Sequence, residues 1–398
     1  MAISPFPKLL IVPGNCQSLG GTVTALSGLI QGWKDCAALW QLCVLVQSDS
    51  LLETYLTNAG HHDCLRAIAA KGKADFLTQA IRWVNQQPIS WPLLLDNTVE
   101  KSLMVPLMLA APRLRRSGRR IYHFFHDSAR SYNFLGYCLR KLAFSSLAPA
   151  AICNSEYTAT QVKWLISNIA GIQRPTFDVK RFQRINLMQP PPPDLQPILD
   201  SGACIILNPS RITEPGIMND KNLMTLILML AHLSNQGQNY HLVLMGEDDT
   251  PGEIYVQQLR AYAEQAGVSD SLTILPPSFE IETYYWHAGI VVTLAPREPF
   301  GLIVVEAIAA GIPVVGSSSG GIGETLGQFA PIWRVDPHNP VAAAQTVLQV
   351  LQDPRTSEFV LEGQKWVYQN CDTVHQARNM MQIIGIEASV APHEVSAH

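Results

Sequence analysis

The sequence has no long hydrophobic run and little charge. No run of about 18 or more apolar residues is found, so we expect no membrane-spanning helix. The N-terminal MAISPFPKLLIVPG is not expected to be a signal peptide, because its apolar run is short and ends in Pro-Gly. Charged residues make up 15% and hydrophobic residues 47%, which is typical of a globular chain and not of a disordered one. The net charge of -4 argues against general nucleic-acid binding.

Several patterns that would indicate a particular chemistry are also missing. No Cys-x-x-Cys pair occurs among the eight cysteines, which are scattered in apolar surroundings, so we expect buried free thiols in a reducing cytoplasm. The cluster His61, His62, Asp63 and Cys64 has the wrong spacing for one zinc ion. The chain contains no serine-hydrolase elbow and no P-loop lysine motif. We therefore expect neither a metal nor a cofactor.

Strand-like and helix-like segments alternate along the chain, which predicts parallel sheets with helices on both faces. A length of 398 residues suits two domains of about 200 residues each. The run of prolines at 190–193 predicts a stiff linker between them. The expected organisation is a first domain at 1–189, a linker at 190–200, a second domain at 201–362, and helices with a frayed tail at 363–398. Apolar strand-like segments lie at 8–12, 39–47, 91–96, 121–127, 150–154, 203–210, 240–247, 272–277, 290–296 and 312–317.

The segment REPFGLIVVEAIAAGIPVVGSSSGGIGE, residues 297–324, combines an apolar helix with an isolated acid. From Leu302 to Ala310 every residue is apolar except Glu306, so the helix is expected to be buried. A carboxylate there needs either a neighbouring cation or a polar ligand. Pro299 suits a helix entry, and Gly301 allows a ligand to approach the backbone without meeting a Cβ atom.

The same segment resembles the signature of family 4 retaining glycosyltransferases, which have the GT-B fold. The resemblance rests on Glu-Pro-Phe-Gly, on seven residues between Glu298 and Glu306, and on the later AGIPVV and GGIGE. It implies an α/β protein of two Rossmann-like parallel-sheet domains that face each other across a cleft. It also implies that a late helix, starting near 363–371, returns to the N-terminal domain.

The resemblance assigns the donor site to the second domain. Glu306 would accept hydrogen bonds from the ribose hydroxyls of the nucleotide, and Glu298 would bind hydroxyls of the donor sugar. The backbone amides at the positive end of the helix would face the sugar and phosphate; these are the amides of Phe300, Gly301, Leu302 and Ile303.

Two cations follow the first strand of the second domain. Arg211 and Lys221 are either surface charges or, as the resemblance implies, the groups that stabilise the departing diphosphate. The interval between them looks a few residues longer than is usual in the family. Gly246 resembles the family glycine near the nucleotide. The neighbouring acids, Glu247, Asp248 and Asp249, lack the Asp-x-Asp arrangement of metal-dependent transferases, so we expect them to be solvated turn residues.

Two features of the first domain suit a ligand. Gly20 and Gly21 precede an apolar-periodic helix, as in loops that approach phosphates, although such turns are common after a first strand. His126 ends a strand, where a lone histidine is more often structural. The resemblance gives it contact with the transferred sugar, and His123 lies close enough in the sequence to be confused with it.

The resemblance, taken with these features, implies a cytoplasmic, metal-independent, retaining hexosyltransferase. The expected donor is a UDP-sugar, preferably UDP-glucose, and the expected acceptor is a glycan or a lipid-linked glycan in polysaccharide or cell-envelope biosynthesis. The basic segment RLRRSGRR, with arginines from Arg113 to Arg120, is either a solvated helix end or a patch for anionic lipid or acceptor at the inner face of the plasma membrane. Two alternatives stay open, namely a GT-B epimerase acting on a nucleotide sugar and a non-catalytic sugar-nucleotide scaffold.

Overall fold

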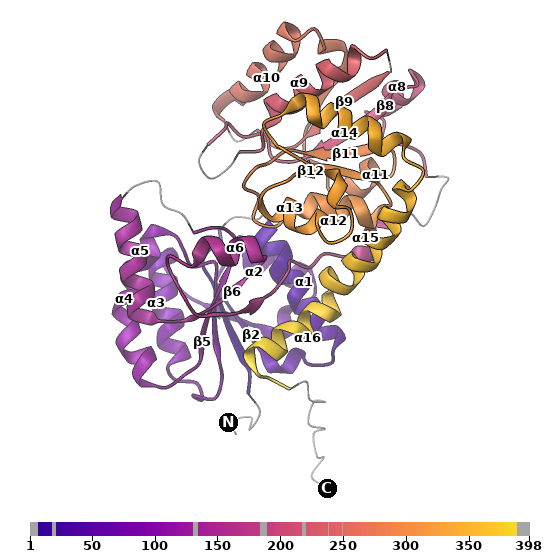
Figure 1. Cartoon of the computed structure of the whole chain (residues 1–398). Coiled ribbons are helices and arrows are strands. Elements are labelled where there is room, and N and C mark those ends of the chain that lie inside the picture. Colours follow the sequence, from indigo (N-terminus) through magenta and orange to yellow (C-terminus); the bar gives the residue numbers. More distant parts are fainter. Residues whose placement is uncertain are drawn as a thin grey trace. The chain divides into compact units, whose positions relative to one another are not determined.

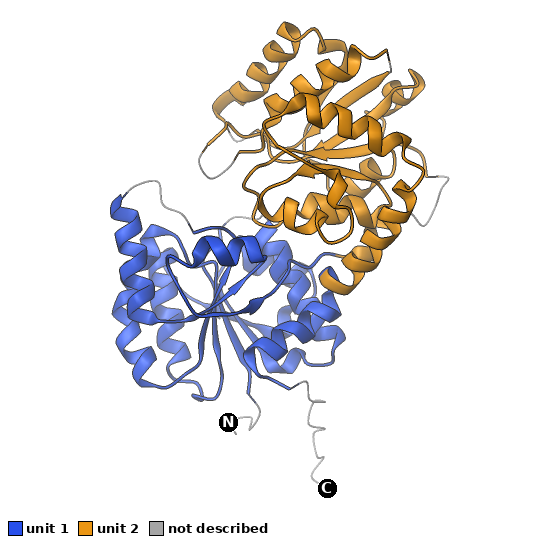
Figure 2. Ribbon diagram, viewed as in Figure 1, with its two compact units in different colours: residues 1–177, 371–398 blue, residues 178–370 orange. Residues whose placement is uncertain are grey.

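The chain divides into two compact units (Figure 2). The computed structural model describes residues 7–17, 21–129, 134–183, 189–216, 220–237, 239–248 and 250–387. Unit 1 comprises Met1–Phe177 and Cys371–His398, and unit 2 comprises Asp178–Asn370. The chain therefore passes from unit 1 to unit 2 at residues 177 and 178, whereas the proline run suggested a boundary at 190. The predicted linker lies inside unit 2, where Gln196–Asp200 forms the short helix α8.

Unit 1 is a seven-stranded parallel sheet flanked by helices (Figure 1). The strand order is β3-β2-β1-β4-β5-β6-β7. The inner strands are short apolar runs, because strands buried on both faces of a sheet have no solvent side to carry polar residues. The strands are β1 Leu9–Pro13, β2 Leu42–Gln47, β3 Leu65–Ile68, β4 Leu93–Asp96, β5 Ile121–Phe125, β6 Ala150–Cys153 and β7 Ile169–Ile172. The helices are α1 Gly21–Asp35, α2 Leu51–Asn58, α3 Lys73–Val84, α4 Lys101–Arg116, α5 Phe134–Leu147, α6 Glu156–Val162 and α16 Thr373–Ile384.

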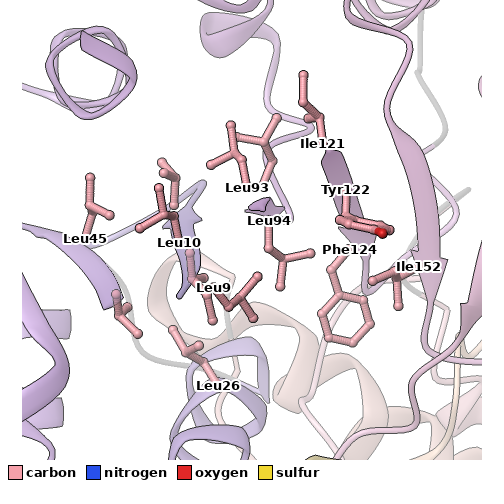
Figure 3. Packing of buried hydrophobic residues seen from close by; sticks show 14 of the residues in the cluster. Leu9, Leu10, Leu26, Leu45, Leu93, Leu94, Ile121, Tyr122, Phe124 and Ile152 are labelled. Atoms are coloured by element: carbon pink, nitrogen blue, oxygen red, sulfur yellow. The ribbon is translucent and has the colours of Figure 1, made fainter. Parts of the chain in front are cut away.

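The core of unit 1 lies between its sheet and helices. Side chains of β1, β4 and β5, including Leu10, Leu94 and Phe124, pack together and are almost fully buried (Figure 3). The C-terminal helix α16 packs on α1. A Cβ atom on Gly32 of α1 would lie 2.1 Å from the carbonyl oxygen of Thr373, so this close approach requires glycine.

Helix α4 runs without a break through Pro106 and Pro112. An internal proline removes a backbone N–H and crowds the preceding turn, so local rules alone would favour a break in this helix. Burial of the helix's apolar face outweighs this cost: Leu103, Leu107 and Leu114 are each 1% exposed or less.

Unit 2 is a six-stranded parallel sheet with the order β10-β9-β8-β11-β12-β13. Its strands are β8 Cys204–Pro209, β9 Tyr240–Met245, β10 Leu272–Leu275, β11 Ile290–Thr293, β12 Val314–Ser317 and β13 Arg334–Val335. Its α-helices are α7 Val179–Phe182, α8, α9 Leu223–Ser234, α10 Ile254–Gln265, α11 Ile281–Tyr285, α12 Leu302–Ala309, α13 Gly320–Leu326, α14 Pro340–Gln352 and α15 Thr356–Cys371. The expected pair of parallel-sheet α/β domains is thus confirmed.

Each sheet has one point where the strand order reverses. In unit 1 this point lies between β1 and β4, and in unit 2 it lies between β8 and β11. Ligands of open α/β sheets bind at such points, outside the carboxyl ends of the strands, because the adjoining connections there run to opposite faces. Among the helices of the described residues, none has the length and apolarity needed to cross a bilayer.

Candidate functional site

In unit 2, the loop that precedes α12 is held in place by a pair of glycines. The amide of Gly321 donates to the carbonyl oxygen of Glu298 at 2.7 Å, and the Ser319 hydroxyl donates to the carbonyl of Pro296 at 2.7 Å. A Cβ atom on Gly321 would lie 2.4 Å from Cα of Phe300, so no other residue fits without moving the loop. The glycine pair therefore fixes the shape of the loop that carries Glu298.

Helix α12 begins at a glycine whose backbone is left-handed. Gly301 has φ 88°, a conformation that glycine adopts readily, and it forms the N-cap. The amides of the first turn have no acceptor within the helix and form its positive end. Phe300 is buried, whereas Leu302 and Ile303 are partly exposed. This end of α12 is therefore suited to an anion or to the oxygens of a sugar.

Glu306 accepts a hydrogen bond from a buried tyrosine. The Tyr285 hydroxyl lies 2.8 Å from Oε2 of Glu306, and the Tyr285 side chain is fully buried, whereas Glu306 remains partly exposed. Burial raises the pKa of Glu306, while the Tyr285 hydrogen bond and the charge of Arg181 act to lower this pKa. Arg181 itself pairs with Glu282 at 2.7 Å. The direct partner of the isolated acid is thus a hydroxyl, with a cation acting at longer range.

Lys221 and Glu298 form an ion pair beside α12. Nζ of Lys221 donates to Oε2 of Glu298 at 2.5 Å, and the two side chains are 17% and 24% exposed. The next residue, Asn222, has φ 55° and donates from Nδ2 to the carbonyl of Leu294, which ties the loop after β8 to the end of β11. Two segments that are 77 residues apart therefore meet at the reversal point of this sheet.

Arg211 and Gly246 lie against each other at the ends of β8 and β9. Arg211 is exposed two residues beyond β8. A Cβ atom on Gly246 would lie 2.1 Å from the carbonyl oxygen of Ser210, so glycine is needed there for the backbone that leads to Arg211. Part of the long interval before Lys221, residues 217–219, lies outside the described residues.

Asp248, which follows β9, accepts the hydrogen bonds of a turn. Asp248 accepts hydrogen bonds from the amide and hydroxyl of Thr250 and from the amide of Val256. Glu247 is exposed and Asp249 lies outside the described residues. Asp248 therefore orders the start of α10.

In unit 1, His126 is paired with an acid at the end of the neighbouring strand. Its Nε2 lies 2.7 Å from Oδ1 of Asp96, with side-chain exposures of 9% and 8%. Nδ2 of Asn154 donates to the carbonyl oxygen of His126 at 2.9 Å. His123, by contrast, is fully buried and accepts from the amide of Thr98, and burial lowers its pKa to about 3. His123 is therefore a neutral core residue, and His126 is the histidine at the strand end.

A hollow opens at the reversal point of the unit 1 sheet, next to this pair. Gly21 is the first residue of α1, and a Cβ atom on it would meet nothing within 4 Å. Gly20 lies outside the described residues. The polar and backbone groups of the hollow come from the ends of β1 and β4 and the start of α1, and include Pro13, Gly14, Asn15, Thr22, Asp96 and Asn97.

The histidine cluster before β3 is engaged in local structure. Nε2 of His61 lies 3.1 Å from the Ser27 hydroxyl, and Sγ of Cys64 donates to the carbonyl of His61. Within the described part of the chain, no group of three His, Cys, Asp or Glu side chains is arranged to hold a metal ion.

Two functional candidates were missed by the sequence analysis. Tyr285 and Asp96 are the partners of Glu306 and His126, and neither belongs to a motif that we identified. The available signal was position: Asp96 ends the apolar run WPLLLD, and Tyr285 ends the helix just before β11.

Two parallel-sheet α/β units with polar groups at their reversal points define a protein of the GT-B class. Residues 215–365 match the family model of group 1 glycosyl transferases. This part of the chain, which carries Lys221, Glu298 and Glu306, belongs to the glycosyl transferase group 1 family, which is family 4 of the resemblance described above.

Similar sequences and structures agree with this assignment. The chain is 32% identical to a D-inositol 3-phosphate glycosyltransferase of Xylanimonas cellulosilytica over 130 residues, which is 32% of this chain and 30% of that protein. A homologous enzyme of Salinispora tropica is 28% identical over 133 residues, or 33% and 27% of the two chains. The chain thus spans only about a third of these relatives. Anabaena HepE in complex with UDP-glucose has a TM-score of 0.71 at 18% identity and covers 94% of this chain and 99% of its own. Sucrose-phosphate synthase of Thermosynechococcus elongatus has a TM-score of 0.66 at 16% identity, over 94% and 98%.

Proposed function

We propose that the protein is a retaining, metal-independent hexosyltransferase that uses a nucleotide-diphosphate sugar, with UDP-glucose as the preferred donor. The donor class is supported by the family of residues 215–365 and by HepE, a structural neighbour that binds UDP-glucose. The proposed acceptor is a glycan or a lipid-linked glycan in polysaccharide or cell-envelope biosynthesis.

The observation that carries this proposal is the Lys221–Glu298 pair at the start of α12. A cation and an acid are held 2.5 Å apart beside the positive end of a helix, at the reversal point of a parallel sheet. A nucleotide sugar offers both complementary groups, because its diphosphate is anionic and its sugar carries hydroxyl donors. On donor binding, Lys221 would turn to the diphosphate and Glu298 would accept hydrogen bonds from the sugar.

The proposed chemistry requires stabilisation of the leaving diphosphate. Negative charge grows on the β-phosphate as the glycosidic bond breaks, and the groups proposed to oppose it are Lys221, Arg211 and the first-turn amides of α12. In this mechanism the acceptor hydroxyl attacks the face from which the diphosphate departs, and no protein nucleophile is needed. The two cationic side chains and the positive end of α12 together stabilise the diphosphate, which is the electrostatic role that a metal ion plays in other transferases.

Glu306 is proposed to bind the ribose. One side of its carboxylate is held by Tyr285, while the side chain remains partly exposed, so acceptor capacity is left for hydroxyl donors. A pair of ribose hydroxyls would satisfy a carboxylate whose burial is otherwise costly.

The unit 1 hollow is proposed to take the acceptor side of the reaction. Its lining is polar at the ends of β1 and β4, and Asp96 joins it to His126. The hydrogen bond to Asp96 fixes the proton on Nε2 of His126 when the ring is neutral, which leaves Nδ1 as an acceptor. The proposed role of His126 is contact with the transferred sugar, and that of Gly20 and Gly21 is backbone approach to the ligand.

The test is a donor screen on two variants and a matched control. UDP-, GDP- and ADP-sugars are each measured for thermal stabilisation and for slow donor hydrolysis. Glu298→Gln and Lys221→Ala should abolish transfer and leave the protein folded, whereas Lys365→Ala, an exposed lysine of the same unit, should not change turnover. Unchanged turnover in either site variant would refute the site assignment. No response of the wild type to any nucleotide sugar would favour the scaffold alternative, and sugar interconversion without an acceptor would favour the epimerase.

A further inference from the structure

Helices α4 and α5 are strongly cationic in an acidic protein. Neither helix contains an Asp or Glu, and together they carry six Lys and Arg residues: Lys101, Arg113, Arg115, Arg116, Arg140 and Lys141. Because the whole chain has a net charge of -4, the remainder carries -10. The positive charge is therefore concentrated on two helices of unit 1.

The same two helices expose an unusual share of large apolar side chains. Of the fourteen such side chains found exposed among the described residues, six lie on α4 or α5. Scattered single exposures are normal on any protein, but a concentration on one pair of elements indicates an interaction surface. The six are Val105 at 50% exposed, Leu109 at 78%, Phe134 at 81%, Leu135 at 66%, Tyr137 at 40% and Leu142 at 57%.

On α4 the apolar and cationic groups share one stripe, and α5 packs beside this helix. Helices α4 and α5 pack against each other along one side of unit 1 (Figure 1). On α4, Val105, Leu109, Pro112 and Arg116 are all exposed and are spaced four, three and four residues apart, which places them in one stripe. Nη1 of Arg115 reaches the carbonyl of Ser146 and so links the ends of the two helices. The apolar stripe thus leads into the arginines at the end of α4.

Only part of the basic segment RLRRSGRR belongs to this surface. Arg119 is 6% exposed and donates to the carbonyl oxygens of Val84, Gln87, Pro88 and Trp91, where it caps the end of α3. Arg120 donates to the carbonyl of Ile384 at the end of α16. These two arginines are structural, so of the arginines from Arg113 to Arg120 only Arg113, Arg115 and Arg116 are left for a surface patch.

We propose that the α4–α5 surface docks on an anionic lipid bilayer. Apolar side chains flanked by arginine and free of carboxylates fit the interface of such a bilayer, where hydrocarbon and negative headgroups lie side by side. The charge favours an anionic bilayer over a second copy of the chain. Neither helix carries an acid, so the same surface of a second copy would offer no negative charge to pair with the arginines. The surface belongs to unit 1 alone, and the proposal does not depend on the proposed reaction.

The experiment is sedimentation of the full-length protein with vesicles. Wild type should bind vesicles of phosphatidylglycerol and phosphatidylcholine, bind pure phosphatidylcholine much less, and lose binding as salt rises. Arg113→Gln and Arg116→Gln should each reduce partition about fivefold, whereas Arg260→Gln, an exposed arginine of unit 2, should not. Leu142→Gln should also weaken binding, and Leu361→Gln is its matched control because both leucines are 57% exposed.

Four results would overturn the proposal. The first is equal binding to neutral and anionic vesicles. The second is an equal loss of binding in the Leu142 variant and its Leu361 control. The third is displacement from vesicles by soluble glycerol phosphate, which would indicate a pocket for a phosphate group. The fourth is seen by light scattering. If the wild-type protein self-associates and Leu142→Gln makes it monomeric, the surface is an interface between copies of the chain and not a bilayer-docking surface. Thermal unfolding of each variant should match wild type, since every replaced side chain is exposed.

Discussion

Glu306 lies in the apolar helix α12 and accepts a hydrogen bond from Tyr285. The substitution Glu306→Gln distinguishes the effect of the buried charge on the free energy of unfolding from its effect on donor binding. Glutamine has nearly the same shape, and its Oε1 can still accept the hydrogen bond from the Tyr285 hydroxyl. The variant removes only the negative charge and one acceptor oxygen. We expect unit 2 to become more stable at alkaline pH and to bind the donor more weakly.

The stability change has a definite sign with pH. Burial raises the pKa of Glu306 above its ordinary value of 4.5, so the folded protein keeps this proton at a pH where the unfolded chain has lost it. The free energy of unfolding therefore falls as pH rises from the unfolded value through the folded pKa. Glu306→Gln lacks this pH dependence. The two proteins should therefore be similarly stable in acid, diverge as pH rises from the unfolded to the folded pKa of Glu306, and differ by a constant amount above it.

The magnitude follows from two opposing contributions. Burying a carboxylate costs several kcal/mol, and a hydrogen bond to a charged group returns about 1.5–3 kcal/mol, which leaves about 1–2 kcal/mol in favour of glutamine once the folded carboxyl is ionised. For a unit of this size, each kcal/mol corresponds to about 2–4 °C in the unfolding temperature. Loss of charge-assisted bonds to the ribose should weaken UDP-glucose binding about tenfold to a hundredfold.

The assay is thermal unfolding from pH 5 to pH 9, with and without UDP-glucose, supported by calorimetric titration. Glu264→Gln is the control, because this exposed acid on α10 belongs to the same unit and should change neither curve. A Glu306→Gln variant that is less stable than wild type at every pH would refute the argument that burial of the charge is costly. Unchanged affinity for UDP-glucose would refute the ribose assignment.

Three further predictions concern unit 1. Gly21→Ala should raise the free energy of unfolding by about 0.5–1 kcal/mol, because the residue begins a helix with open space around it, yet it should reduce transfer activity measured alongside. Arg119→Ala should cost about 3–5 kcal/mol in chemical denaturation, since four carbonyls lose a buried cationic donor, whereas Arg116→Ala should cost less than about 0.5 kcal/mol. His123 has its pKa lowered to about 3, so the unfolded chain takes up this proton first and stability should fall as pH drops from about 6.5 towards 3. His123→Asn should flatten that acid limb in pH-dependent unfolding.

Much of the fold could be predicted because its inner strands are buried on both faces. Runs such as Leu9–Pro13 and residues 93–95 are apolar and short, and the helices between them show the longer period. The change of unit near Phe177 could not be predicted in this way. A proline run indicates stiff backbone, but it does not say which unit the stiff backbone packs against.

The candidate site could likewise be predicted only in part. The sequence indicated that Glu306 needs a partner, yet Tyr285 lies 21 residues away on another helix, and periodicity assigns a residue to a face without naming its neighbour. Likewise the spacing of Lys221 and Glu298 carries no information on their contact. That contact follows from the reversal of strand order between β8 and β11, which only the assembled sheet defines.

The glycines of the two units show how functional residues can be told from structural ones. Gly246 and Gly321 are required by protein backbone that passes against them, so folding alone explains why they carry no side chain. Gly21 has open space around its missing side chain, and folding does not explain it. Glu306 is the same kind of exception, because an apolar residue would suit α12 better. Natural sequences depart from local rules mainly where function requires it, so the residues that folding leaves unexplained are the strongest indication of where the ligand lies.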